Sequence, residues 1–318
     1  MGKLRLTWAG LLTASLLAGC GIGGTDEEAV RRKNATTTPP AAQEPGAPAL
    51  SGDNATDGLN WINYRRSQVG VAVLTRNSLI DAAALGHSNY QRSNKTITHD
   101  QTAGLTGFTG TKLLDRLTAA NYTLGSVYAA GEVISATTNT SGFSQAEELI
   151  TAIYHRYVIF DPAFREIGAG SATITGGYTY FTANFGATGS YNSLGKGVIV
   201  TYPLNNQTGV PVNFYSDTEA PDPVPNQNLV GYPISVHADQ YGGNRGEVVV
   251  QSFTVVPRGG TALSTRLLSY AAGNNHDIPS AAAIIPLSPL AAATTYDVSF
   301  SGTVAGVAVT RSWSFTTK

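Results

Sequence analysis

The chain has 318 residues and a single cysteine, Cys20. One cysteine cannot form a disulfide within the chain, so the fold must be stabilised by burial of apolar side chains. Charged residues make up 13% of the sequence, against roughly 25% in an average soluble protein. The formal net charge of -1 gives no basic surface of the kind that binds nucleic acid. We therefore expect no nucleic-acid partner.

The N-terminal segment has the layout of a secretory signal. Lys3 and Arg5 precede an apolar run that begins near Trp8 and ends in small residues before Cys20. The run is short for a membrane span, which needs about 20 apolar residues. We predict a signal peptide over residues 1–20, and we find no later segment apolar enough to cross a membrane.

The ending Leu17-Ala18-Gly19-Cys20 resembles the lipobox of bacterial lipoproteins. The resemblance implies cleavage before Cys20 and attachment of lipid to its thiol and new amino group. The protein would then be exported and anchored to the bacterial cell envelope, at the outer membrane or the cell surface, with the membrane as a partner through Cys20. The alternative is a plain signal peptide that happens to contain a cysteine.

Residues 21–57 are predicted to form a disordered tether. They are rich in Gly, Thr and Pro, and they carry few large apolar groups that could offset the entropy cost of ordering. A flexible spacer of this kind would hold the folded part away from a membrane.

The next segment predicts helices followed by two strands. Apolar spacing indicates helices from Leu59, from Asn77 or Ser78, over 112–120, and from Ser144, where Ser144 and Glu147 suggest a capping box. Strands are predicted over 167–173 and 178–185, separated by a Thr-Gly-Gly turn.

The pattern changes after Gly186. Residues 187–195 indicate a linker, and the remainder is β-rich with no helical periodicity. Strands are predicted over 198–202, 234–238, 248–256, 296–300 and 313–317. Regular spacing of short strands favours a β-sandwich over residues 196–318. Trp313 and Phe315 alternate with serines, so we expect both in its core.

Common catalytic motifs are absent from the sequence: there is no G-x-S-x-G elbow, no H-E-x-x-H pair and no P-loop. The candidate polar residues are His87, His99 and His155, together with Glu132, an acid in an otherwise apolar segment. A carboxylate there must be at the surface or held by a buried partner.

An ordered set of short motifs between residues 59 and 186 resembles the CAP superfamily of cysteine-rich secretory, antigen 5 and pathogenesis-related 1 proteins, in its cysteine-free bacterial branch. The matching positions are Leu59-Asn60, Arg65, Gly70, Leu79, Ala83-x-x-x-His87-Ser88, His99, Arg116, Tyr122, Gly131-Glu132, His155-Arg156, Phe164, Ile167-Gly168 and Phe185-Gly186. The resemblance implies an α+β fold, with an α-β-α sandwich over residues 58–187 around a central antiparallel sheet.

The C-terminal part resembles a bacterial Ig-like module. The matching stretches are 208–211, 231–236, 287–290, 295–296 and the terminal strand Ser312-Trp313-Ser314-Phe315-Thr316. The resemblance implies an all-β Ig-like sandwich with a role in spacing or adhesion.

The CAP resemblance also implies a cleft with two histidines and two acidic residues, which binds a divalent metal in some members. By position, His99 is similar to the first histidine and Glu132 to the glutamate of the Gly-Glu-Asn motif, while His155 would face the cleft and His87 would lie nearby. Two departures from the family pattern count against a complete set of two histidines and two acidic residues. Val133 replaces the motif asparagine, and the strand motif that ends in His-Tyr-Thr-Gln reads Tyr-Phe-Thr-Ala from Tyr180, without its histidine.

These residues leave two interpretations of the cleft open. His99, Glu132 and His155 have the ligand types that zinc prefers, or they form a hydrogen-bonded polar cluster without metal. The polar cluster would correspond to a module that binds an extracellular protein or lipid, and the zinc site to a metal-assisted envelope hydrolase. A third possible function is a lipid or sterol binder. No catalytic residue is assigned.

The remaining polar residues receive structural interpretations. We interpret Glu147 as a helix cap, Arg116 as a helix arginine that pairs locally, and His237 and His276 as exposed residues of the β-rich part.

Overall fold

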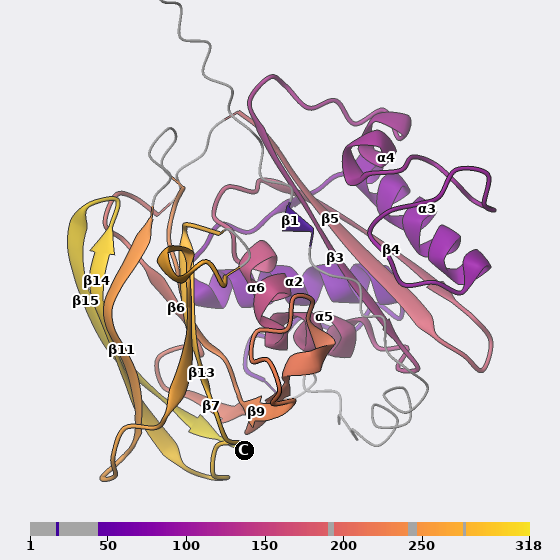
Figure 1. Ribbon diagram of the computed structural model, residues 1–318. Helices are drawn as coiled ribbons and strands as arrows, with labels where there is room; N and C mark the ends of the chain where they lie inside the picture. The colour runs from indigo at the N-terminus through magenta and orange to yellow at the C-terminus, as the bar shows by residue number, and fades with distance from the viewer. Residues whose placement is uncertain (1–16, 19–43, 190–193, 241–246, 276–277) are drawn as a thin grey trace, which may run out of the picture.

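The computed structural model describes residues 17–18, 44–189, 194–240, 247–275 and 278–318. Its first part is an α-β-α unit and its second a β-rich region packed beside it (Figure 1). Cys20 and most of the predicted tether lie outside the described residues. Among the described residues, no helix is long and apolar enough to cross a membrane.

The centre of the first part is a sheet with the strand order β1-β3-β5-β4-β2. The three long strands β3 (Tyr128–Thr137), β5 (Thr179–Thr188) and β4 (Glu166–Thr173) pair antiparallel. The two-residue strands β1 (Leu17–Ala18) and β2 (Thr75–Arg76) add in parallel at opposite edges. The predicted antiparallel sheet and its two C-terminal strands are therefore confirmed.

Helices α3 (Ser78–Asn94) and α4 (Leu113–Ala119) cover one face of this sheet (Figure 1). A Cβ atom at Gly168 or Gly170 of β4 would lie 2.2 Å from a backbone nitrogen of α3. Both positions therefore need glycine, because the helix backbone rests directly on the strand. Asn77, one of the two positions predicted for the start of this helix, caps α3 by accepting a hydrogen bond from the Leu79 amide.

Helices α2 (Asn54–Val69), α5 (Gly142–Thr151) and α6 (Ile153–Ile159) cover the opposite face. The alternation of β5 separates the two faces, since successive side chains of a strand point to opposite sides. Phe181 joins the apolar core with α2, whereas Thr182 hydrogen-bonds to Ser88 of α3. The helix α2 begins inside the segment predicted as a tether.

The start of α5 differs from the prediction. Ser141 is the N-cap, and its side chain accepts a hydrogen bond from the Ser144 amide. The predicted capping box of Ser144 and Glu147 is wrong, because the helix begins at Gly142 and Ser144 lies within its first turn. Glu147 instead accepts hydrogen bonds from Trp61 Nε1 at 2.6 Å and Arg65 Nε at 2.9 Å, so it ties α5 to α2.

In its described residues, the second part of the chain is all-β apart from two short 3-10 turns, η2 (Ser216–Thr218) and η3 (Tyr270–Ala272). It contains two four-stranded sheets with the orders β12-β13-β10-β6 and β11-β14-β15-β7, and a two-stranded sheet β8-β9. All pairs are antiparallel except β7 with β15. Its strands are β6 (Val200–Tyr202), β7 (Gln207–Val210), β8 (Asn213–Tyr215), β9 (Leu229–Gly231), β10 (Ile234–His237), β11 (Val248–Pro257), β12 (Thr265–Ser269), β13 (Ala281–Pro286), β14 (Thr295–Val304) and β15 (Val307–Thr317).

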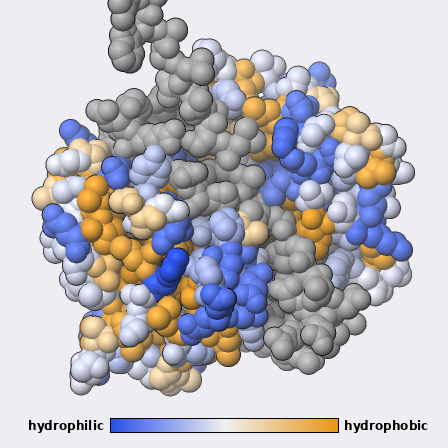
Figure 2. All heavy atoms as spheres, in the orientation of Figure 1, coloured by the Kyte–Doolittle hydropathy of each residue, from blue (hydrophilic) through white to orange (hydrophobic). Residues whose placement is uncertain are grey.

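One apolar core runs from the α2, α5 and α6 layer into both sheets of the β-rich region. Trp313 and Phe315 are buried in it, as predicted. Figure 2 shows hydrophobic residues gathered on the side of the molecule that the β-rich region forms, and the exposed apolar side chains of this region include Val249 and Val307. The continuous core means that the two parts share one interior.

Candidate functional site: a polar cluster around Glu132

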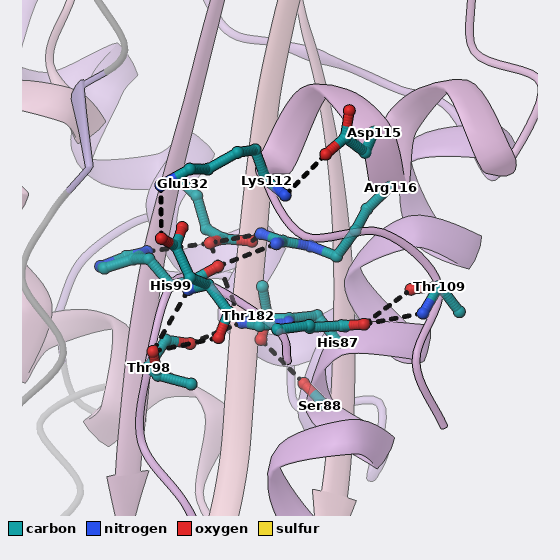
Figure 3. Close-up of polar contacts among 12 residues, drawn as sticks. His87, Ser88, Thr98, His99, Thr109, Lys112, Asp115, Arg116, Glu132 and Thr182 are labelled. Carbon is teal, nitrogen blue, oxygen red and sulfur yellow. Dashed lines mark hydrogen bonds and ion pairs between the residues drawn. The ribbon is translucent and has the colours of Figure 1, made fainter. Parts of the chain in front are cut away.

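Glu132 is the centre of a buried polar cluster on the α3 and α4 side of the sheet (Figure 3). It projects from β3 and is only 1% exposed. Its partners come from three other elements: His87 from α3, His99 from the connection between α3 and α4, and Arg116 from α4. The fold therefore brings together three of the four residues predicted for the cleft.

Arg116 makes the strongest contacts with Glu132. Its Nη2 donates to both carboxylate oxygens, at 2.8 and 2.7 Å, and the arginine side chain is fully buried. Its Nη1 donates to the carbonyls of His99 at 2.8 Å and Thr111 at 3.2 Å. The interpretation of Arg116 as a locally paired helix residue is wrong, because its partner lies on another element 16 residues away.

Glu132 is ionised despite its burial. Burial raises the pKa of a carboxyl group, but the charge of Arg116 and the contacts with His87 and His99 outweigh this effect and hold the pKa of Glu132 at about 2. The Glu132–Arg116 pair is therefore a complete internal ion pair at any physiological pH.

His99 connects this ion pair to the rim of the cluster. Its Nδ1 lies 2.8 Å from Glu132 Oε1, and because the carboxylate can only accept, Nδ1 carries the proton. A neutral ring then has a lone pair on Nε2. That atom is buried and has no hydrogen-bond partner among the described residues, while 14% of the side chain stays exposed. His99 thus holds a buried acceptor without a hydrogen-bond partner, on a side chain that is partly exposed.

His87 is fully engaged by the protein. Its Nδ1 accepts from the Gln101 amide at 3.0 Å and its Nε2 donates to the Thr98 carbonyl at 2.8 Å. Burial lowers its pKa to about 4, so the ring is neutral at physiological pH. His87 Nε2 also lies 3.9 Å from Glu132 Oε1.

Strand β5 adds polar side chains that the sequence reasoning missed. Asn184 pairs with Glu132 in the sheet register and shares its face, and it is fully buried. Neither atom of its amide has a hydrogen-bond partner among the described residues. Thr182, two residues earlier, accepts from Ser88 Oγ at 2.9 Å. The signal was present, since two polar residues alternate within an otherwise apolar strand sequence.

His155 does not join the cluster, and its prediction as a cleft residue is wrong. It lies on α6, on the opposite face of the sheet, and its Nδ1 is 3.1 Å from Glu219 Oε2 of the β-rich region. Glu219 Oε1 accepts from the Tyr154 amide at 2.8 Å. His155 therefore belongs to the interface between the two parts of the chain.

The other two histidines lie in the β-rich part of the chain. His237 was expected at the surface, but it is buried between Tyr157 and Phe160, where burial lowers its pKa to about 3. Its Nε2 is 3.0 Å from Ser235 Oγ. His276, like Cys20, lies outside the described residues.

The cluster does not fit the divalent metal that the family resemblance implied. No three His, Cys, Asp or Glu side chains of the described part converge as a metal site. The predicted set of His99, Glu132 and His155 is divided between the two faces of the sheet. The lone pairs of Glu132 are directed at Arg116 and His99.

The fold and the cluster together define an α-β-α sandwich with a buried His/Glu/Arg group beneath two helices. Residues 59–185 match the family model CAP, described as the cysteine-rich secretory protein family. This match confirms the predicted resemblance over that segment, which we call the CAP domain; the β-rich region follows it. A search of the curated proteins found no match to the chain.

Several solved structures are similar to the chain. An extracellular protein containing an SCP domain from Bacillus anthracis is 22% identical, with a TM-score of 0.36 and coverage of 44% of each chain. An outer surface protein from Borrelia burgdorferi is 15% identical, with a TM-score of 0.35 and coverage of 41% of this chain and 90% of that one. The venom allergen-like protein 4 of Schistosoma mansoni is 13% identical, with a TM-score of 0.29 and coverage of 45% and 96%. Our chain thus covers less than half of the Bacillus anthracis protein.

Proposed function

We propose that this protein is an envelope-anchored binding module whose CAP domain holds an extracellular ligand at His99, without catalysing a reaction. The observation that carries the proposal is the unpartnered Nε2 of His99 beside a cluster whose charges are already balanced. A buried polar atom without a partner costs free energy, so its retention favours a role in binding.

The chemistry of the cluster suggests what the ligand presents. Glu132 holds the proton of His99 on Nδ1, which leaves Nε2 as an acceptor, so the ligand must offer a hydrogen-bond donor such as a hydroxyl or amide group. The internal Glu132–Arg116 pair leaves no excess charge for an ionic ligand. A neutral hydroxylated molecule fits both conditions, and a sterol or a sugar would satisfy them.

The absence of an activated nucleophile favours binding over hydrolysis. Nucleophilic catalysis needs a hydroxyl or thiol within hydrogen-bond reach of a base. In the described part of the chain, no hydroxyl contacts His99 Nε2, and the Ser88 hydroxyl is committed to Gly170 and Thr182. The Ser235–His237 contact lies at the interface between the two parts of the chain, where both side chains are buried, whereas 14% of the His99 side chain is exposed.

Lipid attachment at Cys20 and an Ig-like role for the β-rich region complete the proposal. The lipobox-like ending supports the anchor. The two four-stranded sheets, antiparallel apart from β7, support a sandwich whose role is spacing or adhesion at the envelope. Metabolic labelling with radioactive palmitate tests the anchor. We expect labelled protein from the natural chain and none from Cys20→Ala; equal labelling of both would contradict lipidation.

Ligand binding can be tested on the chain from residue 21 with N-acetylglucosamine oligosaccharides and cholesterol as probes. We expect one of them to bind and to lose about five- to tenfold in affinity in His99→Ala, since one hydrogen bond of this kind contributes about 1–1.5 kcal/mol. Gln251→Ala, an exposed position on β11, is the control and should bind normally. Turnover of ester or amide substrates that His99→Ala abolishes would replace the binding proposal with a hydrolase.

A further inference from the structure

Arg116 supplies the positive charge at the centre of the polar cluster. Its guanidinium touches both oxygens of Glu132 and also holds the carbonyl of His99. It supplies the positive charge that keeps this buried carboxylate ionised. Arginine stays protonated in proteins, so the charge is permanent.

The remaining nitrogen ligands are also restricted. His87 uses both ring nitrogens within the protein, on Gln101 and Thr98, and His99 directs its protonated Nδ1 at Glu132. Only His99 Nε2 is left, and a stable zinc site needs three or four protein ligands. A divalent cation would also have to approach a fixed guanidinium, which repels it.

We propose that Arg116 is a built-in cation that replaces a divalent metal and masks a latent metal site made of His87, His99 and Glu132. The three side chains already lie close together, since Glu132 Oε1 is 2.8 Å from His99 Nδ1 and 3.9 Å from His87 Nε2. Removal of the guanidinium charge frees the carboxylate oxygens. The carboxylate and the imidazoles could then turn their lone pairs toward one ion.

The experiment is a zinc titration by calorimetry on the untagged protein from residue 21 to residue 318. Arg116→Met removes the charge and keeps the side-chain length, whereas Arg116→Lys retains a positive charge and is the matched control. The natural protein and Arg116→Lys should show no saturable binding of zinc. Arg116→Met should bind one zinc ion, and His99→Ala in that background should weaken binding by roughly 10–100-fold.

Each result decides the inference. One-to-one zinc binding by the natural protein that His99→Ala removes would overturn it, whatever the variants do. A folded Arg116→Met protein that binds no zinc would also overturn it, because Arg116 would not be what masks the site. Circular dichroism checks folding first, and if Arg116→Met does not fold, Arg116→Gln takes its place with the same expectation. Zinc is the probe throughout, so failure to find an organic ligand at His99 leaves this test unaffected.

Discussion

The two faces of the central sheet each bury a histidine, an arginine and a glutamate, and they use them differently. On the α3 and α4 side, His99, Arg116 and Glu132 contact one another within the CAP domain. On the α6 side, the histidine and arginine turn to the β-rich region, where His155 meets Glu219.

Arg156 shows how far the second face is committed to the interface. Its Nη1 donates to the Pro233 carbonyl at 2.7 Å and to Ser235 Oγ at 3.3 Å. Its guanidinium also lies 4.9 and 5.0 Å from the ring centroids of Tyr202 and Tyr232. The same kinds of side chain thus build a polar cluster within the CAP domain on one face and an interdomain contact on the other. What distinguishes them is whether the partners lie in the same domain, because both clusters contain a ring nitrogen without a hydrogen-bond partner among the described residues, His99 Nε2 on one face and His155 Nε2 on the other.

The largest effect should follow from breaking the ion pair of the α3 and α4 face. Glu132→Gln leaves Arg116 buried without its counter-charge, which should cost about 3–5 kcal/mol of unfolding free energy. Urea denaturation measures this loss. The exposed pair Arg258–Asp297 provides the control, and Asp297→Asn should leave stability unchanged. A Glu132→Gln protein as stable as the natural one would show that the pair is not what holds this face.

Breaking the other face should lower stability and also separate the two parts of the chain. Arg156→Met removes hydrogen bonds to three carbonyls and one hydroxyl across or next to the interface, so we expect a loss of about 3 kcal/mol. Because the core is continuous, the natural protein should unfold in one transition. The variant should show two transitions in calorimetry and cleavage near residues 189–194 in limited proteolysis. A single, unshifted transition would contradict the assigned role.

Buried titratable groups on both faces make stability depend on pH. Burial lowers the pKa of His87 to about 4 and that of His237 to about 3, whereas an unfolded histidine titrates near 6.5. The unfolded state therefore binds more protons as the pH falls below about 6.5, and stability is lost. Asp161 acts in the opposite direction, since burial raises its pKa to about 6 and the folded state holds its proton.

Because two histidines outweigh one aspartate, acidification lowers the unfolding free energy. We expect the unfolding free energy to be about 2 kcal/mol lower at pH 5 than at pH 7, measured by urea denaturation. The variant His237→Phe should reduce this slope, because the ring lies in an aromatic environment that tolerates phenylalanine. A protein that gains stability between pH 7 and pH 5 would contradict the assignment.

The smallest expected effect is a gain in stability, and it concerns the unpartnered amide of Asn184. Asn184→Leu replaces a buried amide that has no hydrogen-bond partner among the described residues, so stability should stay constant or rise by about 1 kcal/mol. Thr182→Val on the same face should lose about 1 kcal/mol, because it leaves the Ser88 hydroxyl without one of its partners. Thermal melts of the two variants measure the contrast. Equal losses would mean that Asn184 has a structural role.

Local patterns made several elements predictable from the sequence. The start of α3 was predicted at Asn77 or Ser78, and the structure has Asn77 as its N-cap. The β4–β5 hairpin was predicted from its Thr-Gly-Gly turn. The family resemblance placed His99 and Glu132 together. The partner of Arg116 could not be predicted, because the contact depends on how α4 rests against β3, and spacing along the helix carries no information about that.

The error for His155 has a specific physical origin. The sequence predicted one helix from Ser144 past Ile150 with an apolar stripe, and the family resemblance placed His155 of that helix at the cleft. The structure breaks this helix at Ala152, whose backbone is extended with φ -70° and ψ 118°. The break starts a new helix, so the stripe predicted for a continuous helix does not carry over to α6. Hydrophobic spacing did not reveal the break, since both helices are apolar.

The two glycines under α3 affect how mutational data on this protein should be read. Any side chain at Gly168 or Gly170 would collide with the helix backbone and lift α3, and with it His87 and Ser88, off the sheet. A saturation-mutagenesis screen for ligand binding would therefore score both positions as intolerant as Glu132. A functional map drawn from such a screen alone would count two positions without any side-chain chemistry among the ligand contacts.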